Sequence, residues 1–289
     1  MASHTFIDKT RVVQTLDSST YPPMNMRPSR LLQELRSGAS APVLKLNLMD
    51  PRVVELAGLA GASAVWLCNE HVPNDWLNLE HQVRAAKLYN MDTIIRVAKG
   101  SYSDYVKPFE MDATGIMVPH VGSATEAREI VKMCRFGPLG RRPIDGGNMD
   151  GLFCQISTAD YCEQSNREKF IILQIESPEA LENVEEIAAV EGFDFLLFGP
   201  GDFSHLIGKP GQVNDPQVVA ARKRVAAAAV KHGKFAMMPA MLDSRANLES
   251  EGWRAFTVGA DVITLGFGFK EKVEAFNKAE TSVSKRLYE

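Results

Sequence analysis

The sequence predicts an α/β protein built as a (β/α)8 barrel, and three features of the chain support this prediction. From residue 29 onward, apolar segments with strand character alternate with amphipathic helical segments. Eight such strand segments occur over roughly 250 residues, the length typical of this barrel. The strand segments are nearly continuous apolar runs, as parallel strands buried on both faces require. A doubly wound open sheet is the alternative architecture with the same alternation.

The order of the expected elements follows from hydrophobic periodicity. Strands are expected at 43–48, 64–69, 93–98, 115–120, 170–176, 193–200, 235–241 and 262–268. Helices are expected at 51–60, 78–89, 123–135, 179–190, 214–232, 244–253 and 270–285. The segment 179–190 illustrates the rule, because Val184 and Ile187 share an apolar face while its glutamates face outward.

Two regions depart from this regular pattern. Residues 1–28 are polar, so the predicted organisation is an amino-terminal arm over 1–28 and a single barrel domain over 29–289. Residues 137–168 are rich in glycine, arginine and aspartate and show little periodicity. We expect this region to include a loop over one end of the barrel that contributes contacts to a substrate.

Composition narrows the classes of protein to which the chain can belong. A net charge of −4 argues against a general nucleic-acid binder and against binding to anionic membranes. No apolar run reaches the roughly 18 residues of a membrane span. The amino terminus lacks the pattern of a secretory signal. No C-x-x-C pair occurs, so reduced thiols in a cytoplasmic protein are expected at Cys68, Cys134, Cys154 and Cys162.

The strongest functional signal is a pair of carboxylates that end two successive strands. Glu176 follows the apolar run 170–175, and Asp202 follows the run 193–198 within the glycine-rich segment 199–204. Neighbouring parallel strands lie about 4.8 Å apart, so both side chains can converge on one cation. Magnesium and manganese prefer one or two carboxylates together with water and substrate oxygens. The pair therefore predicts a divalent-metal site beside an anion pocket.

Three other residues carry chemistry at the expected strand ends. Arg96 interrupts an apolar strand, which favours a structural ion pair, a fixed positive charge for an oxyanion, or both. His71 follows the neighbouring strand, and an imidazole is the natural proton carrier near neutral pH. Lys45 is the one lysine within an expected strand, so a Schiff-base mechanism remains an alternative. His120 also ends a strand, although a packing role explains it equally well.

These residues lie within motifs that resemble the HpcH/HpaI aldolase and citrate lyase family of metal-dependent pyruvate aldolases. The resemblance covers about residues 31–275 and follows the family order. The motifs are Glu70-His71-Val72-Pro73-Asn74-Asp75, Ile95-Arg96, Gly115-Ile116-Met117-Val118-Pro119-His120, Ala124 to Arg128, Gly140-Arg141-Arg142, Gln174-Ile175-Glu176 and Gly199-Pro200-Gly201-Asp202-Phe203-Ser204.

The resemblance implies a fold and a set of site residues. The fold is a phosphoenolpyruvate/pyruvate-type barrel whose last helix is exchanged between subunits of a homo-oligomer, a hexamer or a trimer of dimers. Glu176 and Asp202 would bind Mg2+, with Mn2+ or Co2+ as alternatives, and the backbone around Gly201 and Asp202 would hold the pyruvate carboxylate. Arg96 would stabilise an enolate oxygen, Gln174 would support a water on the metal, and His71 would take part in proton transfer.

The chain departs from the family pattern at two acidic positions. Cys68 stands where the family usually has an aspartate three residues before His71, and Glu110 stands where the family often has an aspartate. The carboxylate that orients the imidazole is therefore absent or relocated. Because decarboxylation needs no base for a hydroxyl proton, His71 should matter less for that reaction than for aldol cleavage.

The sequence therefore predicts a metal-dependent carbon–carbon lyase acting on a small 2-oxo acid. In the leading interpretation, a 4-hydroxy-2-oxo acid is cleaved through an enolpyruvate on the ion to pyruvate and an aldehyde. The first alternative is an oxaloacetate decarboxylase or an enolate-trapping enzyme similar to macrophomate synthase. The second alternative is a catalytically silent barrel used for binding or assembly.

Overall fold

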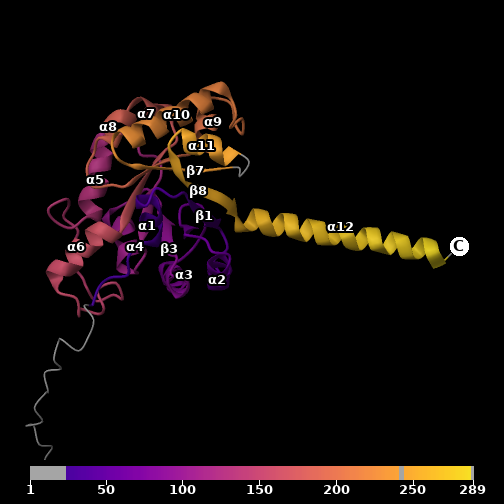
Figure 1. The fold of residues 1–289 in the computed structure, drawn as a ribbon, viewed down its shortest axis with the longest axis horizontal. Coiled ribbons are helices and arrows are strands. Elements are labelled where there is room, and N and C mark those ends of the chain that lie inside the picture. The colour runs from indigo at the N-terminus through magenta and orange to yellow at the C-terminus, as the bar shows by residue number, and fades with distance from the viewer. Residues whose placement is uncertain (1–23, 241–243, 288–289) are drawn as a thin grey trace, which may run out of the picture.

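The computed structural model describes residues 24–240 and 244–287, and its centre is a closed barrel of eight parallel strands (Figure 1). Neighbouring strands pair in the order of the chain, and the last strand pairs with the first. The strands are β1 Ala41–Leu46, β2 Ala64–Cys68, β3 Asp92–Arg96, β4 Gly115–Val118, β5 Phe170–Ile175, β6 Phe195–Phe198, β7 Phe235–Pro239 and β8 Trp253–Ala260. This closure confirms the predicted (β/α)8 barrel and excludes the open sheet. The expected arm falls mostly on residues 1–23, and Met241 ends an expected strand; both lie outside the described residues.

Helices connect the strands and cover the outside of the barrel. They are α1 Arg30–Arg36, α2 Pro51–Leu59, α3 Trp76–Leu88, α4 Tyr102–Glu110, α5 Ala124–Cys134, α6 Thr158–Glu168, α7 Pro178–Glu182, α8 Val184–Ala188, α9 Pro200–Leu206, α10 Pro216–Lys231, α11 Arg245–Ser250 and α12 Asp261–Leu287. Many begin at a serine or aspartate whose side chain accepts a hydrogen bond from the first turn, as Ser123 does for α5 and Asp75 for α3. The expected helix 179–190 is divided at Asn183 into α7 and α8.

Alternation along each strand separates an inner core from an outer core. Ile94 and Ile172 belong to the cluster inside the barrel, whereas Ile95 and Ile171 belong to the cluster between strands and helices. The helix α1 closes the amino-terminal end of the barrel with side chains that join the inner cluster, Leu31, Leu32 and Leu35. The carboxyl-terminal end is therefore the open end, where polar residues meet.

The prediction for the last strand is wrong. The segment 262–268 begins α12, and β8 occupies Trp253–Ala260, which overlaps the end of the helix expected at 244–253. The apolar run at 262–268 suits a buried strand, but it lies on an exposed helix, with Ile263 57% and Phe267 71% accessible. Apolar composition alone does not distinguish these two cases.

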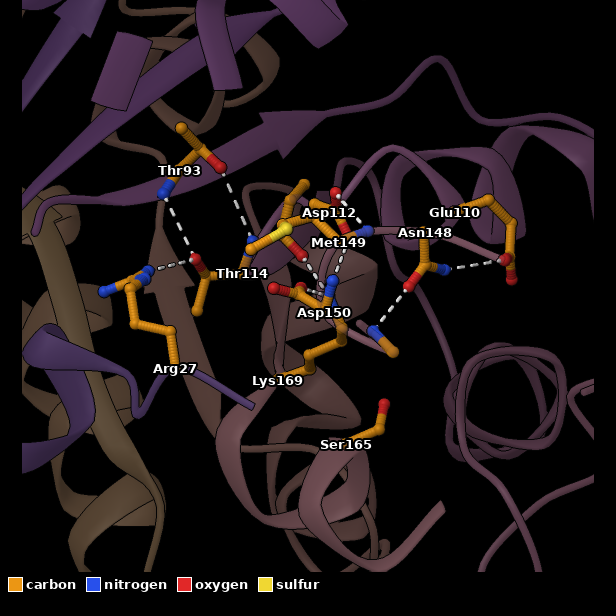
Figure 2. Close-up of polar contacts among 12 residues, drawn as sticks. Arg27, Thr93, Glu110, Asp112, Thr114, Asn148, Met149, Asp150, Ser165 and Lys169 are labelled. Atoms are coloured by element: carbon orange, nitrogen blue, oxygen red, sulfur yellow. Dashed lines mark hydrogen bonds and ion pairs between the residues drawn. The ribbon is translucent and has the colours of Figure 1, made fainter. Parts of the chain in front are cut away.

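The irregular segment between α5 and α6 lies at the amino-terminal end of the barrel (Figure 2). The backbone N–H of Asp150 donates to Asp112 at 2.9 Å, and the Asp150 carboxylate accepts from Lys169 Nζ at 2.5 Å. Asp112 and Lys169 stand just before β4 and β5, opposite to the strand ends that carry Arg96 and Gln174. The expectation that this loop contacts substrate in its own subunit is therefore wrong. These buried charges instead fix the loop to the starts of two strands.

The helix α12 leaves the barrel and extends away from it as a single rod (Figure 1). It contains 27 residues and exposes several large apolar side chains, among them Phe267, Phe269, Val273 and Phe276. Throughout residues 24–240 and 244–287, no helix combines the length and the apolar character needed to cross a membrane.

The packing of α1 into the amino-terminal end of the barrel, here called the α1 plug, can be tested by substitution. Leu32 is fully buried in the inner cluster, so Leu32→Ala should lower the free energy of unfolding by about 2–5 kcal/mol in urea denaturation. Leu88→Ala removes the same atoms from a side chain that is 76% exposed and should cost less than about 0.5 kcal/mol. Equal losses in the two variants would contradict the plug.

Candidate active site

A layer of polar side chains closes the inner core at the carboxyl ends of the strands. Four strands each carry one of these polar side chains, and the residue two positions earlier in each strand belongs to the inner cluster. These earlier residues are Val43, Trp66, Ile94 and Ile172. Strand alternation therefore turns the next inner residues toward the open end of the barrel. These residues are Lys45 on β1, Cys68 on β2, Arg96 on β3 and Gln174 on β5.

Arg96 is buried in this layer, with 4% of its surface exposed. Its Nε lies 3.0 Å from Glu70 Oε2, and its Nη2 donates to Cys68 Sγ at 3.1 Å. Its guanidinium carbon lies 4.7 Å from the centre of the Trp66 ring, within the range of a cation–π contact. The contact with Glu70 is an ion pair rather than an aligned hydrogen bond, because neither atom has a hydrogen-bond partner among the described residues. The structural ion pair considered from the sequence is present and leaves room for a functional role.

Cys68 contacts Arg96 rather than the imidazole of His71. Its Sγ accepts from Arg96 Nη2 and also from the backbone N–H of His71 at 3.4 Å. Burial raises the pKa of the Cys68 thiol, but the hydrogen bond and positive charge of Arg96, together with the backbone N–H groups of His71 and Glu70, outweigh burial and leave this pKa below its usual value. The carboxylate near the His71 ring is Glu70, at 3.6 Å from Nε2, so the acidic neighbour of this histidine is relocated rather than lost.

Glu176 is a buried carboxylate, 1% exposed, held by two neighbours. Its Oε1 accepts from the His120 backbone N–H at 2.8 Å and lies 3.0 Å from His120 Nδ1, and its Oε2 accepts from Gln174 Nε2. The pKa of Glu176 is raised to about 7: burial is the largest cause, the charges of Asp202 and Glu70 also raise it, and the contacts with His120 partly oppose them. This environment favours a cation beside the carboxylate.

Asp202 lies in the first turn of α9, after the Gly199 cap that follows β6. Asp202 and Gly201 are exposed, and Asp202 is near enough for its charge to contribute to the raised pKa of Glu176. A Cβ on Gly199 would lie 2.7 Å from Glu176 Oε2 and 2.8 Å from its Cβ, so only glycine fits there. The close approach of this backbone brings the two acids together.

The surroundings of His71 and His120 differ from those expected from the sequence. The side chain of His71 is 60% exposed, and Glu70 is the acid beside its ring. His120, for which packing seemed equally good, directly contacts Glu176. Its φ of 52° is unusual for a residue other than glycine and turns both its backbone N–H and its ring toward Glu176. The sequence placed His120 at a strand end, which is where the site lies. The orientation of its side chain depends on a backbone dihedral angle that the sequence composition does not reveal.

The residues present fit a divalent cation with oxygen ligands. Glu176 has a raised pKa, Asp202 is near it, and Gln174 Oε1 is buried without a hydrogen-bond partner in the described chain. No three side chains of His, Cys, Asp or Glu form a preformed metal cage within residues 24–240 and 244–287. Magnesium does not need one, since it binds one or two carboxylates and completes its shell with water and substrate oxygens.

Comparisons with known proteins show what this chain is similar to. A hydroxypyruvate/pyruvate aldolase of Pseudomonas aeruginosa is 34% identical over 198 residues, 68% of this chain and 74% of its own. A 5-keto-4-deoxy-D-glucarate aldolase of Klebsiella pneumoniae is 32% identical and is covered to 90%, against 80% of this chain. The structure of macrophomate synthase is 27% identical, with a TM-score of 0.78 and coverage of 90% of this chain and 93% of its own.

A magnesium complex also shares the fold. The citrate lyase beta subunit of M. tuberculosis, solved with oxaloacetate and magnesium, is 17% identical with a TM-score of 0.52 and covers 78% of this chain and 93% of its own. At this identity it supports the barrel alone. The family model for HpcH/HpaI aldolase/citrate lyase matches residues 43–266, most of the barrel. The chain therefore belongs to the HpcH/HpaI aldolase/citrate lyase family.

Proposed function

We propose that this class II pyruvate aldolase, a carbon–carbon lyase, cleaves the C3–C4 bond of a 4-hydroxy-2-oxo acid to give pyruvate and an aldehyde. The observation that carries the proposal is the buried Glu176 with its raised pKa, placed in the same barrel mouth as Arg96. One side of the mouth attracts a cation and the other presents a fixed positive charge. A 2-oxo acid has the oxygens to use both.

Glu176 and Asp202 would hold the divalent ion, with Mg2+ as the first choice and Mn2+ or Co2+ as alternatives. When bound, the ion supplies Lewis-acid polarisation of the 2-oxo group. Gln174 Oε1, which has no partner among the described residues, would orient a water in this region. The backbone around Gly201 and Asp202 would hold the substrate carboxylate.

Arg96 would stabilise the negative charge that develops on the 2-oxo oxygen. Its position is fixed by Glu70 and Cys68, so little reorganisation is needed when the charge appears. A base removes the proton from the 4-hydroxyl group as the C3–C4 electron pair moves to the enolate, and C3 then takes a proton to form pyruvate. We assign proton transfer to His71, whose Nε2 lies 3.6 Å from Glu70 Oε2.

The second candidate function is decarboxylation of oxaloacetate or trapping of its enolate. The high exposure of His71 favours this candidate, because decarboxylation needs Arg96 and the acid pair but no base for a hydroxyl proton. The presence of the complete set of Arg96, Glu176 and Asp202 argues against a silent barrel.

The function and its metal requirement are tested by measuring pyruvate release from 4-hydroxy-2-oxopentanoate, with oxaloacetate as the competing substrate. Chelation should abolish release, and Glu176→Gln should lower kcat/KM by more than about 100-fold, since the carboxylate holds the ion. Glu179→Gln, on the exposed start of α7, is the matched control and should retain activity. Turnover of oxaloacetate alone would select decarboxylation, and full activity without metal would overturn the metal site.

The pH dependence of metal binding follows from the Glu176 pKa of about 7. Below pH 7 the ion must displace a proton, so the affinity for Mn2+ should fall about tenfold per pH unit. The folding stability of the metal-free protein should depend on pH in the opposite direction. The folded state holds the Glu176 proton more tightly than the unfolded chain does, so the stability from this proton is present at low pH and is lost as the pH rises through about 7. Calorimetric titrations with Mn2+ would show this slope; an affinity independent of pH would contradict it.

We also propose that the chain forms a homo-oligomer, a hexamer or a trimer of dimers, through α12, and that it is cytoplasmic. The projecting helix exposes Phe267, Phe269 and Phe276, more apolar surface than a solvated helix carries. On the barrel, a largely apolar hollow lies between β1 and β8, beside α11, and is lined by Ala41, Pro42, Ala240, Phe256 and Val258 together with Ser40 and Arg245. A second copy of α12 has the apolar face that such a surface requires.

The assembly is tested at Phe276. Placing a charge on the apolar face should weaken packing between subunits, so Phe276→Glu should shift the mass in light scattering toward the monomer at micromolar concentration. Lys272→Glu, an equally exposed position on the same helix, should leave the mass unchanged. A monomeric mass for the unmodified protein would contradict the proposal.

A further inference from the structure

His120 follows β4 with a backbone φ of 52°, in the left-handed region that residues other than glycine rarely occupy. We propose that this left-handed turn, defined here as residues 119–122, positions the Glu176 carboxylate for the divalent ion. The inference rests on the proposed function, whose ion it concerns, and assigns His120 as a positioning residue.

The two oxygens of Glu176 face different loops. Oε1 accepts from the backbone N–H of His120, after β4, at 2.8 Å. Oε2 accepts from Gln174 on β5 and lies where a Cβ on Gly199, after β6, would come within 2.7 Å of it. Because β5 lies between β4 and β6, a carboxylate held at Oε1 presents Oε2 to the side that carries Asp202, in the first turn of α9.

The left-handed conformation brings two groups of one residue to the same oxygen. The φ angle sets the direction of the His120 ring relative to the backbone N–H. At 52° the ring Nδ1 lies 3.0 Å from Glu176 Oε1, the oxygen that the N–H already contacts. A residue with a side chain pays a conformational cost in this region, and the conformation persists only where surrounding contacts determine it.

The first set of such contacts is a pair of charged side chains around the turn. Lys99, in the loop after β3, donates from Nζ to the His120 carbonyl at 2.8 Å. The same ammonium lies 2.6 Å from Glu126 Oε1, and Glu126 Oε2 accepts from the Gly122 backbone N–H at 3.0 Å. Lys99 and Glu126 therefore fix the carbonyl at one end of the turn and the N–H at the other.

The second set of contacts attaches the turn to the strand that carries the carboxylate. The Val121 backbone N–H donates to the carbonyl of Gln174, two residues before Glu176, at 3.2 Å. The Gly122 carbonyl accepts from Asn183 Nδ2 at 2.8 Å, at the junction of α7 and α8. The turn and Glu176 are thus held to one strand, and their relative position is fixed before an ion binds.

This fixed position matters because the site has few ligands of its own. Glu176 and Asp202 are the two carboxylates assigned to the ion, so the orientation of each has a large effect on affinity. Hydrogen-bond partners that orient a metal ligand typically contribute about 10- to 100-fold to metal affinity. His120 acts through Glu176 in this role and does not itself touch the ion or the substrate.

The experiment separates the turn from the imidazole ring with three substitutions at His120. His120→Val and His120→Gly both remove the ring, but a β-branched residue strongly disfavours a positive φ whereas glycine adopts it freely. Asparagine tolerates this region and carries a nitrogen on Cγ, as histidine does. In calorimetric titrations of the metal-free protein, His120→Val should weaken Mn2+ binding by about 10- to 100-fold, and the glycine and asparagine variants should stay within about threefold of the unmodified protein.

Lys99 tests the same turn from outside the ion's surroundings. Lys99→Met removes the donor to the His120 carbonyl and should weaken Mn2+ binding about 5- to 10-fold, as expected for one hydrogen bond. Half-activation should need more Mn2+, while kcat at saturating Mn2+ stays within about threefold. Lys99→Arg should restore the affinity. Lys132→Met, an ion-paired lysine of matching exposure (47% against 45%), is the control and should change neither quantity.

The outcomes distinguish this inference from the proposed function. Equal Mn2+ affinity in the valine and asparagine variants would overturn the role of the turn, as would an equal loss in the glycine and valine variants, which would assign the effect to the ring. The aldolase assignment would stand in both cases if the unmodified protein releases pyruvate. If circular dichroism shows that His120→Val does not fold, unchanged affinity in Lys99→Met would overturn the inference. An unmodified protein that does not bind Mn2+ would overturn the proposed metal site and this inference with it.

Discussion

The burial of the Arg96 guanidinium is the constraint on which the arrangement of the site depends. A charge that is 4% exposed at the end of a closed barrel needs negative neighbours and a surface to rest on. Glu70, Cys68 and the face of Trp66 meet this need. Because Glu70 is held there, its carboxylate also comes within 3.7 Å of His120 Nε2 and close to His71. The partner of a buried cation thus lies beside both histidine rings of the site.

The alternation of side chains along the strands that fills the core also positions the polar residues of the site. Ile94 and Ile172 fill the barrel, and the residues two positions later, Arg96 and Gln174, lie above them. A shift of either strand by one residue would turn its polar group into the layer between strands and helices, where it would be unpaired. Core packing and the position of the polar site residues therefore require the same strand register. The inner core lies directly below the site.

The sequence predicted the parts of the structure that depend on local pattern. The ends of buried strands identified Arg96 and Glu176 because polar residues after apolar runs stand out. The direction of His120 was missed because it follows from a positive φ, and β8 was misplaced because an exposed apolar helix has the composition of a buried strand. The path of the segment containing Asp150 depends on long-range ion pairs, which no local pattern reveals.

The mouth of the barrel has an acidic half and a basic half. In each half, burial and a neighbouring like charge disfavour the charged form of a side chain. Glu176 is raised in pKa by burial and by Asp202, and Lys45 is lowered in pKa by burial and by Arg96. Glu70 opposes the shift at Lys45 and His120 opposes the shift at Glu176, but neither cancels it. We have proposed a divalent cation for the acidic half and an anionic substrate for the basic half, and each would relieve the charge of its own half. Since a 2-oxo acid chelates such a cation, each of these two ligands would strengthen the binding of the other across the same mouth.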